Sequence, residues 1–183
     1  MIFSLLATLI AYLVGSLSFA VIVSRAMGLS DPRTYGSGDP GATDVLRSGS
    51  KPAAIVTLLL DAAKGWLPVM LVKWFGPAWD LSEGTQALAG LAAFLGHLYP
   101  VFFAFKGGKG VATAVGVLLA FQPLLALAPL LTFANIVFFT RYVSLASMVP
   151  AVFAPACYLI GDGVAWTASG AKARALIALG LLL

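Results

Sequence analysis

Two glycine-rich stretches of this chain carry cations and hydroxyls at spacings that suit an anion. They read GSGDPGATDVLR over residues 36–47 and KGGKGVAT over residues 106–113. Glycine lets the backbone approach a ligand closely, and successive N–H groups in such a loop form an anion-binding concavity. Arginine adds a bidentate fork for phosphate, and lysine adds a point charge. We therefore expect a site for one or two phosphates, with ligand-binding residues Gly36, Ser37, Gly38, Gly41, Thr43, Arg47, Lys106, Gly107, Gly108 and Lys109.

Neither stretch is a nucleotide-binding motif. KGGKGVAT lacks the GxxxxGK[ST] spacing, and GSGDPG follows an apolar helical run where a dinucleotide motif would follow a strand. The alternative to a binding site is a pair of flexible re-entrant turns whose cations extend toward water.

Three ionisable residues stand inside apolar segments. Asp61 and Lys64 are three residues apart and so share one helix face. Unpaired charges are costly in an apolar medium, so we expect these two side chains to pair with each other or to face a polar interior. Either a structural or a substrate role is open to this pair. His97, the single histidine, precedes KGGKG by a few turns and is a candidate site residue, the alternative being a packing role.

A third polar patch, RYVSLAS, holds Arg141 and the two serines Ser144 and Ser147, which share a helix face. Serines in such helices also bond back to the backbone, so this patch is weak evidence by itself. The sequence has no Ser-His-Asp or HxxxxD arrangement and no metal cluster. We expect no metal or cofactor, and a reaction that depends on positioning and on phosphate stabilisation.

The composition indicates a polytopic membrane protein. Hydrophobic residues make up 61% of the 183 and charged residues 10%, against about 25% charged in soluble domains. The net charge of +4 comes from cations scattered between the apolar segments. This distribution is typical of residues that set membrane topology and does not indicate nucleic-acid binding. The single cysteine, Cys157, cannot form an intrachain disulfide.

The apolar runs predict an all-α bundle of seven spans in one domain, residues 1–183, since a span needs about 20 apolar residues. A proline after Gln122 predicts a helical hairpin between the fourth and fifth runs. The first run lacks a basic n-region and a cleavage site, so we expect an uncleaved helix. The last run is short, and we expect a further tail. The seven runs are residues 2–23, 53–72, 85–105, 111–121, 124–139, 143–160 and 171–183.

The distribution of cations predicts that the N-terminus lies outside. Seven cations then lie in inner loops, and three (Lys73, Lys172, Arg174) in outer loops. Both glycine-rich stretches would face the cytoplasm, beside apolar helices. Such a pocket suits a substrate with a phosphate head and an acyl tail. The seven inner cations are Arg25, Arg33, Arg47, Lys51, Lys106, Lys109 and Arg141.

The motifs GSGDPGATDVLR, DAAKG, GHLYPVFFAFKGGKGVAT and RYVSLAS, in this order over nearly the whole chain, resemble the bacterial glycerol-3-phosphate acyltransferases that use acyl phosphate. The resemblance implies seven helices in the bacterial plasma membrane, with the active site facing the cytoplasm. It implies acyl transfer to the 1-hydroxyl of glycerol 3-phosphate, giving lysophosphatidic acid and phosphate. This is the first acylation of phospholipid biosynthesis.

The resemblance also implies residue roles. Ser37 and Gly38 would hold the phosphate of acyl phosphate, and Arg47 and Lys109, with Ser147 beside them, that of glycerol 3-phosphate. His97 would lie at the reacting centre, so His97, Ser37 and Lys109 are the expected catalytic residues. No protein base is implied, because a substrate phosphate takes the hydroxyl proton. The implied partners are the two substrates and the lipid bilayer, with no nucleic acid and a monomeric chain.

Two features depart from the family pattern. Where it reads GSGNxGATN, this chain has Asp39 and Asp44. A carboxylate among phosphate-binding amides is expected to repel the substrate. Arg47 could neutralise Asp44, but this arginine would then be unavailable to the substrate. The family also ends in a basic HRxNIxR-type tail, which this sequence does not reach.

Two functions of other classes fit some of these features. The charges at Asp61 and Lys64 are typical of a transporter, here of a phosphorylated solute, although the polar groups gather at one face. The cationic loops also fit a scaffold that binds anionic lipid headgroups. Turnover without transport distinguishes the enzyme from both.

Overall fold

The computed structural model describes residues 1–140, apart from the side chains at positions 124, 125, 128 and 129. This part of the chain is helical throughout and contains no strand, as predicted. The predicted runs 143–160 and 171–183, together with Arg141, Ser144 and Ser147, lie outside the described residues. The helices are α1 (Ile2–Gly15), α2 (Phe19–Ala26), α3 (Ala42–Arg47), α4 (Lys51–Phe75), η1 (Gly76–Trp79), α5 (Glu83–Leu98), η2 (Val101–Phe103), α6 (Val111–Phe121) and α7 (Pro123–Thr140), η marking 3₁₀ helices.

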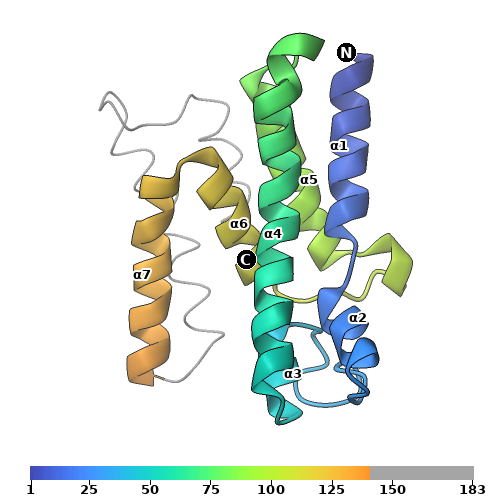
Figure 1. Cartoon of the computed structure of the whole chain (residues 1–183), viewed down its shortest axis with the longest axis vertical. Helices are drawn as coiled ribbons and strands as arrows, with labels where there is room; N and C mark the ends of the chain where they lie inside the picture. The colour runs from blue at the N-terminus through green and yellow to red at the C-terminus, as the bar shows by residue number, and fades with distance from the viewer. Residues whose placement is uncertain (141–183) are drawn as a thin grey trace.

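Helices α1, α4 and α5 run side by side, with α2, α3 and the loop between them at the end away from the N-terminus (Figure 1). Helix α6 packs on α4, and α7 returns beside α6 as the predicted hairpin. Glycines allow these close approaches, as is usual between membrane helices. A Cβ on Gly116 of α6 would collide with the Ala62 carbonyl of α4, and one on Gly15 of α1 with the Ala93 carbonyl of α5.

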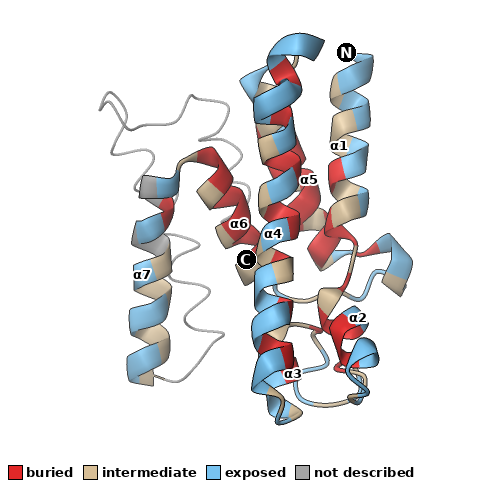
Figure 2. Cartoon of the chain, viewed as in Figure 1, coloured by how far each residue is buried: buried red, intermediate tan, exposed pale blue. Residues whose placement is uncertain are grey.

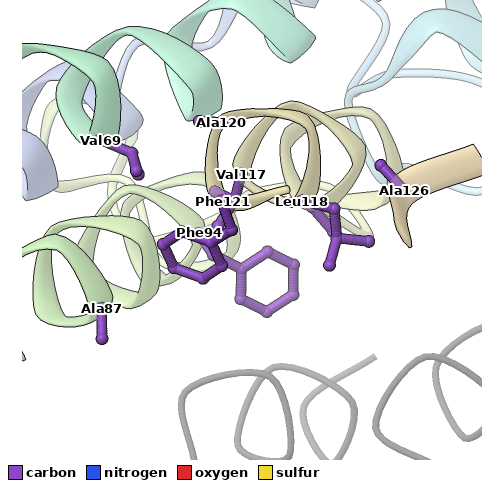
Figure 3. Close-up of a cluster of buried hydrophobic side chains, with 9 residues drawn as sticks. Val69, Ala87, Phe94, Val117, Leu118, Ala120, Phe121 and Ala126 are labelled. Carbon is purple, nitrogen blue, oxygen red and sulfur yellow. The ribbon is translucent and has the colours of Figure 1, made fainter. Parts of the chain in front are cut away.

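The main apolar cluster lies between α4, α5 and α6. Phe94 and Phe121 pack there with Val69 and Val117 (Figure 3). The buried residues line the inner faces, while the outward faces of α4 and α7 are exposed (Figure 2). Those faces are apolar, with Leu59 62% exposed, as is expected where helices meet lipid.

Within residues 1–140, two helical stretches, Lys51–Trp79 and Glu83–Phe103, are long and apolar enough to cross a membrane. The pair α1 and α2 would make a third if it is counted as one bent span. The predicted fourth and fifth runs appear as α6 and α7, of 11 and 18 residues.

The prediction of one continuous helix over residues 2–23 is wrong, because the chain bends by 44° between α1 and α2. Ser18 is extended at the bend, and the Ser16 hydroxyl bonds back to the Tyr12 carbonyl. The Leu17 carbonyl accepts a hydrogen bond from the Lys64 ammonium at 2.7 Å. A helix can break at membrane depth only where the protein satisfies the freed backbone groups, so Lys64 supports this bend.

The run over residues 85–105 is also interrupted. Helix α5 ends at Leu98, and Tyr99 leaves the helical region before η2 begins. Pro100 follows Tyr99, and a residue before proline is driven away from helical torsions. This turn brings the KGGKG stretch back across the end of α5.

Candidate active site

Asp61 and Lys64 form the ion pair that their spacing allowed. The Lys64 ammonium lies 2.7 Å from Oδ1 of Asp61, and both side chains are buried, 2% and 3% exposed. Lys64 also lies 5.7 Å from the centre of the Phe19 ring and donates to the Leu17 carbonyl. The two charges therefore neutralise each other inside the bundle and join α4 to the α1–α2 bend.

The imidazole of His97 lies beside this pair, where α4, α5 and α6 meet. Its Nδ1 is 3.2 Å from Oγ1 of Thr113 and 3.7 Å from Oδ1 of Asp61. His97 is 7% exposed and Thr113 is fully buried. Thr113 was not among the predicted site residues, although it is the last residue of KGGKGVAT and its position opposite His97 depends on the packing of two helices.

The two glycine-rich stretches meet at His97. A Cβ on Gly108 would lie 2.6 Å from the Pro40 carbonyl oxygen and 2.9 Å from Nε2 of His97. A Cβ on Gly107 would collide with the carbonyls of His97 and Leu98. Glycine is thus required at both positions because the loop crosses the end of α5 in direct contact with backbone and imidazole.

The first stretch is organised around a buried carboxylate. Asp44 is 2% exposed and accepts hydrogen bonds from the Ser37 backbone N–H at 3.3 Å and the Ser37 hydroxyl at 2.6 Å. The Arg47 guanidinium lies 3.3 Å from the same carboxylate. Gly36 takes a positive φ of 67° there, and a Cβ on it would lie 2.9 Å from the Arg47 guanidinium.

Asp44 therefore lies inside the loop, where it pairs with Arg47 as the second of the two expectations allowed. The neutralisation by Arg47 is present, yet the arginine side chain remains 55% exposed. Ser37 bonds to Asp44, while Asp39 is only half-buried and its N–H lies 3.4 Å from the Ser37 hydroxyl. The Ser37 hydroxyl is held by a carboxylate, which fixes its orientation.

The remaining predicted residues within residues 1–140 belong to the same two loops, and most of them are exposed. Gly41 is half-buried and begins α3 in an extended conformation. Within residues 1–140, no three His, Cys, Asp or Glu side chains lie close enough to hold a metal ion. Of the predicted ligand residues that the structure describes, the exposed ones are Gly36, Ser37, Gly38, Thr43, Arg47, Lys106 and Lys109.

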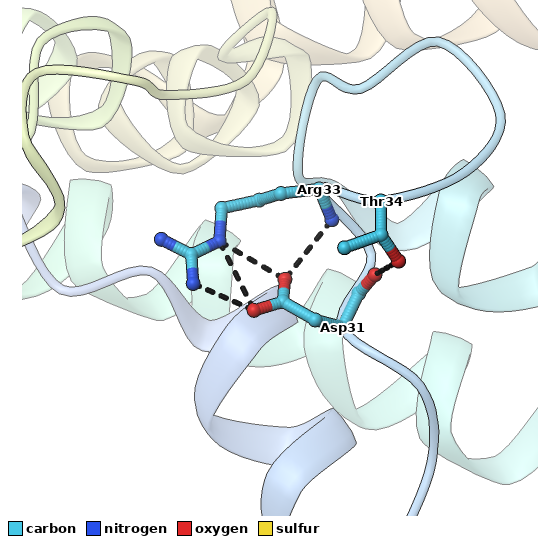
Figure 4. A network of polar contacts seen from close by, with 3 residues as sticks. All are labelled: Asp31, Arg33 and Thr34. Carbon is cyan, nitrogen blue, oxygen red and sulfur yellow. Dashed lines mark hydrogen bonds and ion pairs between the residues drawn. The ribbon is translucent and has the colours of Figure 1, made fainter.

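A third ion pair, which the sequence did not single out, holds the start of the first loop (Figure 4). Arg33 forms a bidentate pair with Asp31, its Nη2 lying 2.6 Å from Oδ2, and Thr34 donates to the Asp31 carbonyl. The guanidinium lies 5.9 Å from the centre of the Phe103 ring of η2. The Arg33 hydrogen bonds lower the pKa of Asp31 to about 2, and the carboxylate raises the pKa of Arg33. This contact joins the loop that precedes GSGDPG to the turn that precedes KGGKG.

Known proteins share both the sequence and the arrangement of this chain. Residues 5–183 match the family described as glycerol-3-phosphate acyltransferase. Proteins of that name from Albidiferax ferrireducens and Ralstonia pickettii are 67% and 55% identical, covering 99% and 92% of this chain and 81% and 82% of their own lengths.

The solved structures agree with the sequences. The crystal structure of PlsY, an integral membrane glycerol 3-phosphate acyltransferase, in its glycerol 3-phosphate form superposes with a TM-score of 0.84 at 38% identity. The match covers 98% of this chain and 85% of that one. The form of the same enzyme with lysophosphatidic acid gives a TM-score of 0.82. The chain belongs to the glycerol-3-phosphate acyltransferase family.

Proposed function

We propose that this protein transfers an acyl chain from acyl phosphate to the 1-hydroxyl of glycerol 3-phosphate, giving lysophosphatidic acid and phosphate. The observation that carries the proposal is the junction of the two glycine-rich loops at His97, where Gly108 touches both Pro40 and the imidazole. Exposed Arg47 and Lys109 flank this junction. The relatives named for this activity, and the PlsY forms with glycerol 3-phosphate and lysophosphatidic acid, support the substrate and the product.

The exposed groups divide between two phosphates in this proposal. The exposed loop at Ser37 and Gly38 holds the phosphate of the donor. Arg47 and Lys109 hold the phosphate of glycerol 3-phosphate as charge-assisted partners. Ser147 also belongs to that set in the proposal. The remaining expected ligands, Gly36, Gly41, Thr43, Lys106, Gly107 and Ser144, line the same loops or follow Arg141.

The reaction needs positioning more than covalent help from the protein. The hydroxyl oxygen attacks the acyl carbon, a C–O ester bond forms, and the bond from the acyl carbon to the phosphate oxygen breaks. The hydroxyl proton ends on the released phosphate. Polar groups fixed in the two loops stabilise the charge that shifts onto this phosphate, and holding both substrates in reach supplies much of the acceleration.

The membrane arrangement in the proposal is a single domain of seven spans, monomeric, in the bacterial plasma membrane, with the N-terminus outside. The cations of the loops beside α3 and α6 then face the cytoplasm, in agreement with the positive-inside rule. The apolar outward faces of α4 and α7 are consistent with contact with lipid.

The donor is tested by supplying palmitoyl phosphate, palmitoyl-CoA or palmitoyl-acyl carrier protein to the purified chain with glycerol 3-phosphate. We expect lysophosphatidic acid, measured by mass spectrometry, from palmitoyl phosphate alone. Product from the thioesters alone would contradict the proposed donor. Uptake of glycerol 3-phosphate into liposomes without any product would favour the transporter.

A further inference from the structure

We propose that Asp61 is a positioning residue for this reaction, holding His97 with its ring proton on Nδ1 so that the Nε2 lone pair faces the loop junction. The inference rests on the proposed function for its chemical meaning. Its geometry stands on the described residues alone.

The two nitrogens of His97 face different surroundings. Nε2 lies on the side of Gly108, where a Cβ would be 2.9 Å away, and so faces the junction of the two loops. Nδ1 lies on the opposite side of the ring, toward Thr113 Oγ1 at 3.2 Å and Asp61 Oδ1 at 3.7 Å. One edge of the imidazole is thus held by buried groups, and the other is presented to the candidate active site.

The surroundings of Nδ1 select one tautomer. A carboxylate is an acceptor only, and a neutral imidazole has one donor and one acceptor nitrogen. The Thr113 hydroxyl can accept from Nδ1 or donate to it, so the carboxylate decides. At 3.7 Å, longer than a hydrogen bond, the Asp61 charge attracts a proton on Nδ1 and repels a lone pair there. The Lys64 ammonium, 2.7 Å from Asp61 Oδ1, offsets the carboxylate charge. Asp61 and Lys64 together carry no net charge. Their effect is therefore to orient the neutral ring, and they do not draw a second proton onto it.

This tautomer determines which substrate group can bind at Nε2. An Nε2 lone pair accepts a hydrogen bond from a hydroxyl but repels an ionised phosphate oxygen, which has no proton to donate. His97 would therefore receive the hydroxyl end of glycerol 3-phosphate, while Arg47 and Lys109 receive the phosphate end. A group that orients a histidine in this way is worth about 10- to 100-fold in comparable metal sites.

The buried network also fixes the ring in space. Asp61 is bound to Lys64, and Lys64 donates to the Leu17 carbonyl at the α1–α2 bend. The imidazole is thereby held in place by contacts to α4 and α6, and through Lys64 to the end of α1. Preorganisation of this kind holds a site group within the narrow range that a reaction needs.

The test uses the fact that His97 is the only histidine. Labelling histidine with ¹⁵N gives one pair of ring nitrogen resonances in the detergent-solubilised chain. We expect a protonated Nδ1 and an unprotonated Nε2. In Asp61→Asn the amide oxygen stays at the Lys64 ammonium, but the neutral side chain no longer attracts a proton to Nδ1. The proton should therefore move to Nε2, kcat should fall about 10- to 100-fold, and KM for acyl phosphate should change less than about threefold.

A matched pair of threonine variants keeps the test independent of a buried charge. Thr113→Val removes the hydroxyl beside Nδ1 and should broaden or shift the His97 resonances and lower kcat. Thr57→Val removes an equally buried hydroxyl from α4, one turn from Asp61, that has no hydrogen-bond partner within residues 1–140. It should change neither readout.

A parent ring protonated on Nε2 overturns the inference, as does an Asp61→Asn variant with unchanged resonances and kcat. If Asp61→Asn does not fold, the parent tautomer and the comparison of Thr113→Val with Thr57→Val decide. A parent chain with the expected tautomer but no acyl transfer would contradict the proposed function and leave the orientation of His97 intact.

Discussion

His97 and Gly108 are in direct contact, so close that a Cβ on Gly108 would lie 2.9 Å from the imidazole Nε2. The same Cβ would lie 2.6 Å from the Pro40 carbonyl. One glycine therefore joins the end of α5 to both glycine-rich loops, and the spacing of those loops depends on the absence of a side chain at this residue.

Gly108→Ala is expected to separate the loops and to lower kcat/KM by at least about tenfold, because a misplacement near 1 Å in a positioned site can cost about a hundredfold. The measurement is steady-state turnover with both substrates. Gly84→Ala is the matched control, since its Cβ would meet only the flexible Ser82 hydroxyl, at 3.3 Å, far along α5 from the loops. Equal activity of both variants would contradict the importance of this contact.

Substitutions of Asp44 separate its two contacts. Asn at this position can still accept from the Ser37 N–H but loses the ion pair with Arg47. Such a partly exposed pair is worth up to about 1 kcal/mol, so Asp44→Asn should lower KM for glycerol 3-phosphate by up to about fivefold. Asp44→Ala should instead lower turnover at least about tenfold, because it leaves the Ser37 donors without their acceptor. A rise in KM with Asp44→Asn would show that the carboxylate, and not the freed arginine, assists binding.

The Asp31–Arg33 pair predicts a pH-dependent contribution to stability. The pKa of Asp31 is about 2 in the folded chain, held below its usual value of 3.8 by hydrogen bonds from Arg33. A carboxyl whose folded pKa is lowered stabilises the fold above its unfolded pKa and loses this contribution as the pH falls through the folded pKa. Asp31→Asn should therefore lower the free energy of unfolding by about 1 kcal/mol at pH 7. The difference should shrink as the pH falls below the unfolded pKa of 3.8 and be mostly lost by pH 2.

Thermal or denaturant unfolding in detergent, followed across pH 2–7, measures this effect. Asp80→Asn is the control, because Asp80 is exposed beyond η1 in a left-handed conformation that asparagine tolerates. It should stay within about 0.5 kcal/mol of the parent at every pH. A difference for Asp31→Asn that persists at pH 2 would exclude the ionised pair as its cause.

The sequence predicted the helical fold because apolar periodicity and composition are local properties of the chain. The pairing of Asp61 with Lys64 followed from helical spacing alone. The α1–α2 bend did not follow in the same way. A cluster of Gly and Ser such as Gly15, Ser16 and Ser18 is a recognised breaker signal, but whether it breaks a helix depends on a donor for Leu17, and that donor is Lys64, 47 residues away in sequence.

The candidate site also has features that follow from local sequence and features that depend on tertiary packing. Glycine-rich composition indicated the two loops. Their meeting at His97, however, depends on the turn at Pro100 that follows the end of α5 and on the approach of the Pro40 carbonyl to Gly108. Thr113 could not be assigned from sequence, because a threonine early in an apolar helix has many possible partners. The pairing of Asp44 with Arg47 followed from their spacing, but the burial of Asp44 could not be predicted, because exposure is decided by tertiary packing and not by residue type.

The measurement that tests the central claim most directly is phosphate release by the purified chain from palmitoyl phosphate, with and without glycerol 3-phosphate. We predict release that depends on glycerol 3-phosphate and falls about a hundredfold in Lys109→Ala, because the charge that positions the phosphate of glycerol 3-phosphate is lost. Release should persist in Lys73→Ala, whose lysine lies in the last turn of α4 at the opposite end of the bundle. Release that ignores glycerol 3-phosphate, or that Lys109→Ala leaves intact, would contradict this claim.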